Sequence, residues 1–227
     1  MKQIKKFSLI IGLLITSTAK ADSPLTSTNF ATAYNSEQIV MAAARARGKV
    51  TKQIMEYLID ETKPIGIKVA AINQLGWDFN GKNNAEIFIK FIQEKKAASD
   101  TISSFYIDRA ESMTDSIVNY SISSFNIELL NADELLCYSY LMALDNYFTV
   151  DRAVELAEKA VQLKPDSYTF CIITALIQAQ HISHTGANEC EINKIIKSIK
   201  NDPTLKKDLN EQAIKIIYEY MDLYTCN

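Results

Sequence analysis

Residues 135–165, LLCYSYLMALDNYFTVDRAVELAEKAVQLKP, decide the fold that we expect for this chain. Apolar residues recur there at spacings of three and four, which predicts two helices joined by a short turn. The first helix would bury Leu135, Leu136, Tyr140, Leu144 and Tyr147. A single helix pair cannot cover its own apolar face, so other helices must pack against this one.

Segments on both sides show the same helical periodicity. We expect helices over 37–47, 50–59, 67–77, 85–96, 100–120, 169–183, 188–200 and 208–223. Asn84 and Asn131 stand where an N-cap side chain is favoured. The chain has only 6 Gly and 4 Pro in 227 residues, which favours long helices with short connections. The sequence therefore predicts an all-α fold.

Residues 135–203 resemble the tetratricopeptide repeat. The segment DRAVELAEKAVQLKP has Ala153, Ala160 and Pro165 at three signature positions of that family's second helix. It departs from the pattern at Ala157, where a larger apolar residue is usual, and at Leu141, where the first helix usually has glycine.

Residues 37–96 resemble HEAT-type helices. The resemblance rests on one helix and its preceding turn, with Pro64, Lys68, Ala71, Leu75 and Gly76 at the matching positions. Together the two resemblances imply stacked antiparallel helix pairs, that is, a short α-solenoid. They divide the chain into a HEAT-like half (36–121) and a tetratricopeptide-like half (126–227) that ends in a capping helix. Residues 22–35, rich in Ser, Thr and Ala without an apolar period, are expected to form a flexible leader.

The first 21 residues have the pattern of a signal peptide. Lys2, Lys5 and Lys6 precede the apolar run FSLIIGLLIT (7–16), and Ala19-Lys20-Ala21 offers small residues at a cleavage site. The run is too short for a membrane span. We therefore expect cleavage after Ala21 and export to a bacterial periplasm, with secretion beyond the cell as the variant and a retained anchor as the alternative.

The charge of the chain argues against nucleic acid as a partner. The whole chain has a formal charge of −3, and removal of residues 1–21 with their four lysines leaves −7. An acidic surface repels a phosphate backbone. We expect a protein or peptide partner, no nucleic acid, and no membrane span after cleavage.

Metal-type ligands cluster in one segment, HISHTGANECE. It contains His181, His184, Glu189, Cys190 and Glu191, but neither HExxH nor paired CxxC. We interpret it as a solvated turn and expect no metal. The chain also lacks GxSxG and Gly-rich phosphate loops, and its carboxylates show no distinctive spacing. We therefore expect no catalytic residues and no cofactor.

Four cysteines in an exported chain can form disulfides. We predict Cys190–Cys226. Cys137–Cys171 is possible only if equivalent helices approach closely, because helices about 10 Å apart exceed disulfide reach. Four buried thiols are the alternative.

Aromatic and amide side chains are the candidates for contact with a partner. Trp77 precedes the turn DFNGKNN, where Asn80 and Asn83 could hold a peptide or sugar, although an ordinary turn with a buried Trp77 also fits. Tyrosines concentrate in the second half, either to line a binding surface or to fill the core. The candidates there are Tyr138, Tyr140, Tyr147 and Tyr168.

These residues and the two resemblances favour a non-catalytic scaffold that holds a peptide or protein in the cell envelope. An inhibitor or immunity-type protein for one toxin or enzyme is the first alternative. An enzyme that acts on envelope glycan or peptide is the second, and fold class alone does not decide between them.

Overall fold

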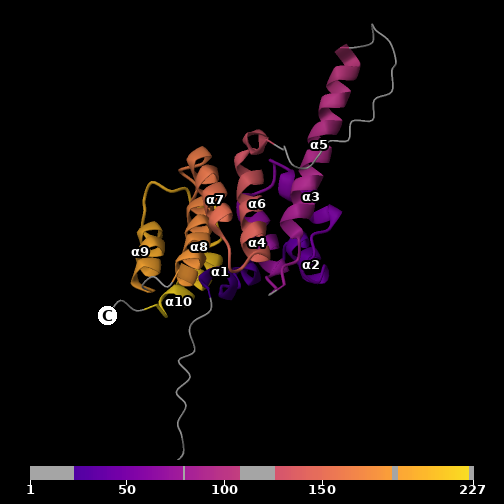
Figure 1. Cartoon of the computed structure of the whole chain (residues 1–227). Coiled ribbons are helices and arrows are strands. Elements are labelled where there is room, and N and C mark those ends of the chain that lie inside the picture. Colours follow the sequence, from indigo (N-terminus) through magenta and orange to yellow (C-terminus); the bar gives the residue numbers. More distant parts are fainter. Residues whose placement is uncertain (1–22, 79, 108–125, 186–188, 225–227) are drawn as a thin grey trace, which may run out of the picture.

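The computed structural model describes residues 23–78, 80–107, 126–185 and 189–224. The described part is helical and contains no strand, which confirms the predicted all-α class (Figure 1). The predicted arrangement as a short α-solenoid stays a prediction. In chain order the helices are α1 (Pro24–Ser27), the 3-10 helix η1 (Phe30–Tyr34), α2 (Gln38–Arg45), α3 (Lys52–Ile59), α4 (Ile65–Leu75), α5 (Asn84–Ile107), the 3-10 helix η3 (Ile127–Leu129), α6 (Ala132–Asp145), α7 (Asp151–Leu163), α8 (Tyr168–Thr185), α9 (Glu189–Lys200) and α10 (Glu211–Met221).

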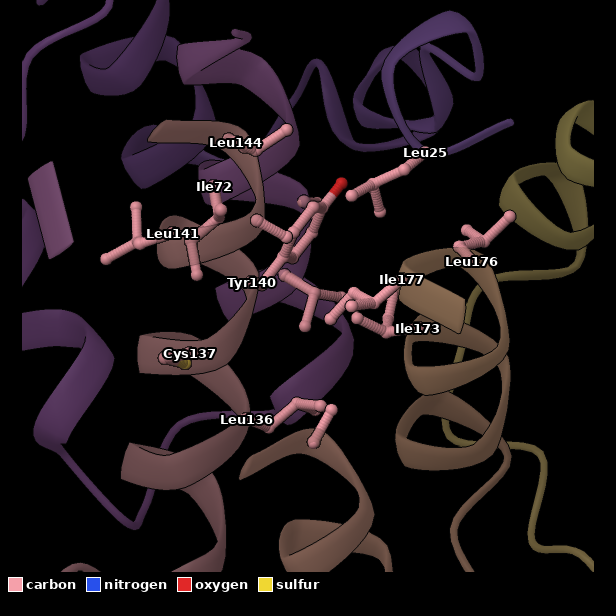
Figure 2. Close-up of a cluster of buried hydrophobic side chains, with 14 of the residues drawn as sticks. Leu25, Ile72, Leu136, Cys137, Tyr140, Leu141, Leu144, Ile173, Leu176 and Ile177 are labelled. Carbon is pink, nitrogen blue, oxygen red and sulfur yellow. The ribbon is translucent and has the colours of Figure 1, made fainter. Parts of the chain in front are cut away.

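Helix α6 lies at the centre of the molecule. It packs against α3, α4, α5, α7 and α8, and α7, α8 and α9 follow it side by side (Figure 1). Figure 2 shows Tyr140 of α6 between side chains of α4, α8 and the N-terminal segment. The stretch 135–165 thus supplies the middle of the core, as the periodicity predicts, while its membership of a repeat family stays a prediction.

The start of α6 is set by local sequence. Asn131 accepts a hydrogen bond from the backbone N–H of Glu134, and the Glu134 carboxylate accepts one from the Asn131 N–H, both at 2.9 Å. This reciprocal arrangement satisfies two donors that a helix leaves free at its first turn. The predicted cap at Asn131 is confirmed.

The predicted cap at Asn84 is wrong. Its side chain is buried, where it accepts from Val50 N at 3.0 Å and donates to Gly48 O at 2.8 Å. The first turn of α5 is capped instead by Asp145, whose Oδ2 accepts from Ala85 N at 2.8 Å. A carboxylate suits this position because the N-terminus of a helix carries partial positive charge.

Helix α5 also differs from its predicted extent. We expected one helix to end at Lys95-Lys96 and a second to span 100–120, but α5 runs without a break from Asn84 to Ile107. The residues between, AASD, include two alanines and no glycine or proline, so nothing stops the helix there. The remainder of the second predicted helix lies outside the described residues.

The N-terminal segment is packed, whereas we expected a flexible leader. Residues 23–34, which we call the N-terminal strap, contain α1 and η1, and Leu25, Phe30 and Ala31 are fully buried. The strap packs against α4, α8 and α10. Burial of these apolar side chains favours the packed state and opposes part of the entropy lost on ordering the segment.

Polar contacts fix the strap to α4 and α6. Asn73 of α4 donates to Thr28 O at 2.9 Å and to the Tyr140 hydroxyl at 3.0 Å, and its Oδ1 accepts from Ala31 N at 2.9 Å. One amide therefore satisfies two backbone groups of the strap and the buried phenol of α6. Buried polar groups need such partners, since an unmade hydrogen bond is costly.

The C-terminal helix α10, expected to cap the stack, packs against η1 and α1 at the other end of the chain. The Tyr34 hydroxyl accepts from Asn210 N at 2.8 Å, just before α10 begins. On another side, the Tyr218 hydroxyl donates to Ile196 O of α9 at 3.0 Å. Buried side chains from both predicted halves belong to one hydrophobic cluster.

Candidate partner-binding surface

Two interhelical loops bring three aromatic rings together. Trp77 follows α4, and Tyr147 and Phe148 follow α6; we call these three residues the aromatic patch. The rings of Trp77 and Tyr147 are stacked with centroids 4.5 Å apart and planes inclined by 22°, and Phe148 meets Tyr147 edge-on at 5.0 Å. Trp77 keeps 36% of its surface exposed and Phe148 57%.

The loop that holds Trp77 is anchored at its base by Lys82. Its Nζ donates to Leu75 O at 2.8 Å and to Gly76 O at 3.2 Å, the carbonyls at the end of α4. Burial lowers the pKa of this ammonium, and the nearby Asp78 and Asp145 act in the opposite direction. Lys82 thus closes the end of one helix and ties it to the start of the next.

Asp145 joins this loop to the end of α6. Its Oδ1 accepts from Lys82 N at 3.1 Å while Oδ2 caps α5. Gly81 adopts a φ of 71° and lies so close to Asp145 that an added Cβ would sit 2.6 Å from the Asp145 carbonyl oxygen. The loop therefore requires glycine here, both for the positive φ and for the close approach.

The predicted turn residues Asn80 and Asn83 are exposed beside this anchor. Asn80 N donates to Asp78 Oδ1 at 3.0 Å, and Asn83 has a φ of 57°, a conformation that asparagine tolerates better than most residues. These two side chains lie on the surface of the same loop as Trp77, as the sequence reasoning required.

Gln180 of α8 supports the other loop. Its amide donates to Tyr147 O at 2.9 Å and to Ala143 O at 3.1 Å, and its Oε1 accepts from the Ser23 hydroxyl at 3.1 Å. Ser23 N also lies 3.4 Å from the Tyr147 hydroxyl. Contacts with the strap and with α8 thus fix the position of Tyr147 in the α6–α7 loop.

The four predicted tyrosines do not form one surface. Tyr140 and Tyr168 are 0% and 2% exposed, so they fill the core and the expectation that they contact a partner is wrong. Tyr168 donates to the Tyr218 hydroxyl at 3.1 Å. Tyr138 is half-buried, and burial raises its pKa. Tyr147 alone of the four joins Trp77. Phe148 was missed, although a large apolar side chain in a turn is the signal that could have identified it.

The segment expected to be a solvated turn contains no described metal site. His181 Nδ1 lies 3.5 Å from Asp151 Oδ1 at the surface. Within the described residues no group of three His, Cys, Asp or Glu side chains is placed to hold a metal ion. The side chains of His184 and Glu189 lie outside the described part.

Cys190 is disulfide-bonded, whereas Cys137 and Cys171 are free thiols. The conditional pairing of Cys137 with Cys171 is therefore wrong. Cys226 lies outside the described residues, so its pairing with Cys190 stays a prediction.

A cavity of about 330 Å³ lies where the strap meets the start of α4 and the segment 207–210. Two polar side chains at its wall, those of Tyr34 and Asp208, are already hydrogen-bonded to other segments of the chain. The Tyr34 hydroxyl accepts from Asn210 N, and the Asp208 carboxylate accepts from Ser167 Oγ and Thr169 N. We therefore interpret the cavity as a junction between elements.

Fold and surface together define an all-helical protein with an aromatic patch built by two interhelical loops. Comparison of the chain with protein-family models, with curated proteins and with solved structures found no match. No helix in the described ranges has the length and apolar character needed to cross a membrane.

Proposed function

We propose that this chain is an exported, non-catalytic binding protein that holds a peptide or protein partner in the cell envelope through the aromatic patch. The observation that supports it most directly is that Trp77 and Phe148 are exposed while both rings pack against Tyr147. Aromatic side chains dominate the energetics of protein interfaces, since they bury a large area with little loss of side-chain entropy.

The rigidity of the base supports this function further. Lys82 and Gln180 donate hydrogen bonds to the two loops, and Asp145 accepts one from Lys82 N, so both loops are held without a partner. A preformed site loses less entropy on binding than one that must be ordered. The patch therefore offers a defined shape that a partner could recognise.

Affinity capture from an envelope fraction tests the proposal. The wild-type chain is compared with Phe148→Ala and with Leu163→Ala as a matched control, because Leu163 is similarly exposed (56%) at the far end of α7. We expect Phe148→Ala to weaken binding of the captured partner by about tenfold or more, the scale of a hot-spot residue, and Leu163→Ala to leave it unchanged.

Trp77→Ala should have the same effect as Phe148→Ala, and circular dichroism confirms that each variant keeps its helices. If the partner binds all variants alike, the patch is not the binding surface and the proposal fails. One stoichiometric partner would indicate an inhibitor of a single target, and several weak partners a scaffold.

A further inference from the structure

The aromatic patch offers ring faces that suit a positively charged guest. The faces of aromatic rings carry negative charge density and attract ammonium and guanidinium groups, Trp most strongly. The chain uses this contact elsewhere: Nζ of Lys200 lies 4.6 Å from the ring centroid of Tyr218, and Nζ of Lys95 lies 5.4 Å from that of Phe91. In the part of the chain that the structure describes, no lysine or arginine lies over Trp77.

Three cations of the two loops and their flanking segments already have partners within the protein. Lys82 donates to the carbonyls at the end of α4, Lys49 donates to Lys82 O at 2.6 Å, and Arg152 pairs with Glu155 at 2.5 Å. Two exposed carboxylates lie close to the patch residues in the sequence. Asp78 directly follows Trp77, and Asp151, three residues after Phe148, has a side chain that is 68% exposed with Oδ1 3.5 Å from His181 Nδ1. Exposed carboxylates so close in the sequence to Trp77 and Phe148 favour a cationic partner over an anionic one.

The charge of the whole molecule acts in the same direction. Residues 22–227 carry a formal charge of −7, because the chain of −3 loses four lysines with residues 1–21. Such a field raises the association rate of a cationic partner and slows that of an anionic one.

From these three observations we infer that the partner segment is basic, with lysine or arginine next to an apolar side chain. The apolar side chain packs on Phe148 and the cation lies over Trp77, with Asp78 and Asp151 beside it. This inference rests on the proposed function, since it names the chemistry of the partner at the same patch.

Trp77 makes the test specific, because it is the single tryptophan of the chain and its fluorescence reports from the patch. The mature chain from residue 22 is titrated with a capped heptapeptide in which lysine alternates with leucine. A second peptide has glutamate in place of each lysine. Each titration is run at about 0.03 M and about 0.3 M ionic strength, between which the screening length falls severalfold.

We expect the lysine peptide to give a saturable change in Trp77 fluorescence, with binding at least about tenfold weaker at the higher ionic strength. The glutamate peptide should bind at least about tenfold more weakly than the lysine peptide. The double variant Asp78→Asn, Asp151→Asn should weaken binding of the lysine peptide about threefold or more. Glu128→Gln, an equally exposed carboxylate before α6 at its opposite end, should leave it unchanged.

The inference is overturned if the lysine peptide gives no saturable response, if the glutamate peptide binds as tightly, or if binding ignores ionic strength. If one of these results is found but binding of the captured envelope partner still depends on Phe148, the proposed function stands and only this inference fails. A captured partner that ignores Phe148 removes the proposed function itself, so the two failures can be told apart.

Discussion

The ammonium group of Lys68 lies inside the helical core. Its side chain has no exposed surface, and Nζ is 2.7 Å from Oδ2 of Asp133 in the first turn of α6. We expect Asp133→Ala to lower the free energy of unfolding by about 3–5 kcal/mol, because it leaves a buried charge without its counter-ion. Urea unfolding followed by circular dichroism measures the change.

The matched control is Glu128→Ala, which breaks an exposed ion pair with Lys159 at 2.6 Å. That change should cost far less than Asp133→Ala, because solvent screens an exposed ion pair. Combining Lys68→Met with Asp133→Leu should recover much of the loss, since no charge then stays buried. A similar loss for Asp133→Ala and Glu128→Ala would contradict this account of the buried pair.

The buried thiol of Cys137 should make stability fall at alkaline pH. Burial raises its pKa from 9.0 to about 12. The unfolded chain loses this proton above pH 9, whereas the folded chain keeps it. The stability that the protonated thiol contributes is therefore fully present below pH 9 and is lost as the pH rises toward 12. At pH 10 the loss from this one group is about 1.4 kcal/mol.

Urea unfolding at pH 8 and pH 10 tests this. The wild-type chain should lose about 1.4 kcal/mol more than Cys137→Ala between the two values. Tyrosines such as Tyr34 and Tyr168, whose pKa burial also raises, affect both chains equally and cancel. Equal losses in the two chains would refute the assignment to Cys137.

Single residues also show where sequence reasoning stops. Tyr140 and Tyr147 are seven positions apart, so a continuous helix would place both on one buried stripe. Helix α6 ends at Asp145, which leaves Tyr140 in the core and moves Tyr147 into the loop beside Trp77. Periodicity identified the stripe, but the roles of the two tyrosines depend on where the helix stops and on contacts with α4.

At the scale of elements, the N-terminal strap was the least predictable part. Its Ser, Thr and Ala content gives no period, yet Leu25 and Phe30 are fully buried. What orders the strap comes from far along the chain, from Asn73, Gln180 and α10. Local composition cannot report contacts with residues that distant. The turn DFNGKNN was predictable for the opposite reason, since the positive φ at Gly81 is a local requirement.

Phe30→Ala tests whether the strap is part of the fold. We expect the free energy of unfolding to fall by about 3–5 kcal/mol, the range for a phenylalanine removed from a packed core. Thr32→Ala, two residues away on the exposed side of η1, should change it by less than about 0.5 kcal/mol. Urea unfolding of both variants measures the difference. If Phe30→Ala has no effect, the strap does not stabilise the fold and the prediction of a flexible leader is favoured instead.

At the scale of the molecule, the sequence predicted the helical class and the central stretch 135–165. It also suggested two halves that meet near residues 121–126, a boundary that contacts in space do not follow. Helix α6 packs on α3, α4 and α5, and η1 packs on α10. The α6 pairings cross the predicted boundary, and the η1–α10 pairing joins residues more than a hundred positions apart. Periodicity cannot reveal such distant contacts.

One core shared by both halves should unfold in one step. Trp77 fluorescence reports on the α4–α5 loop, and circular dichroism reports on all helices, so both signals should give the same urea midpoint and the same dependence on urea. The fragment 126–227 should stay largely unfolded by circular dichroism, because α6 would lose α3, α4 and α5, and α8 would lose α1 and α4. Two separate midpoints, or a fragment that unfolds cooperatively on its own, would show that the halves are independent domains. In that event α4 and the strap could be removed without loss of the C-terminal core, which contradicts the burial of Leu25 against α8 (Figure 2).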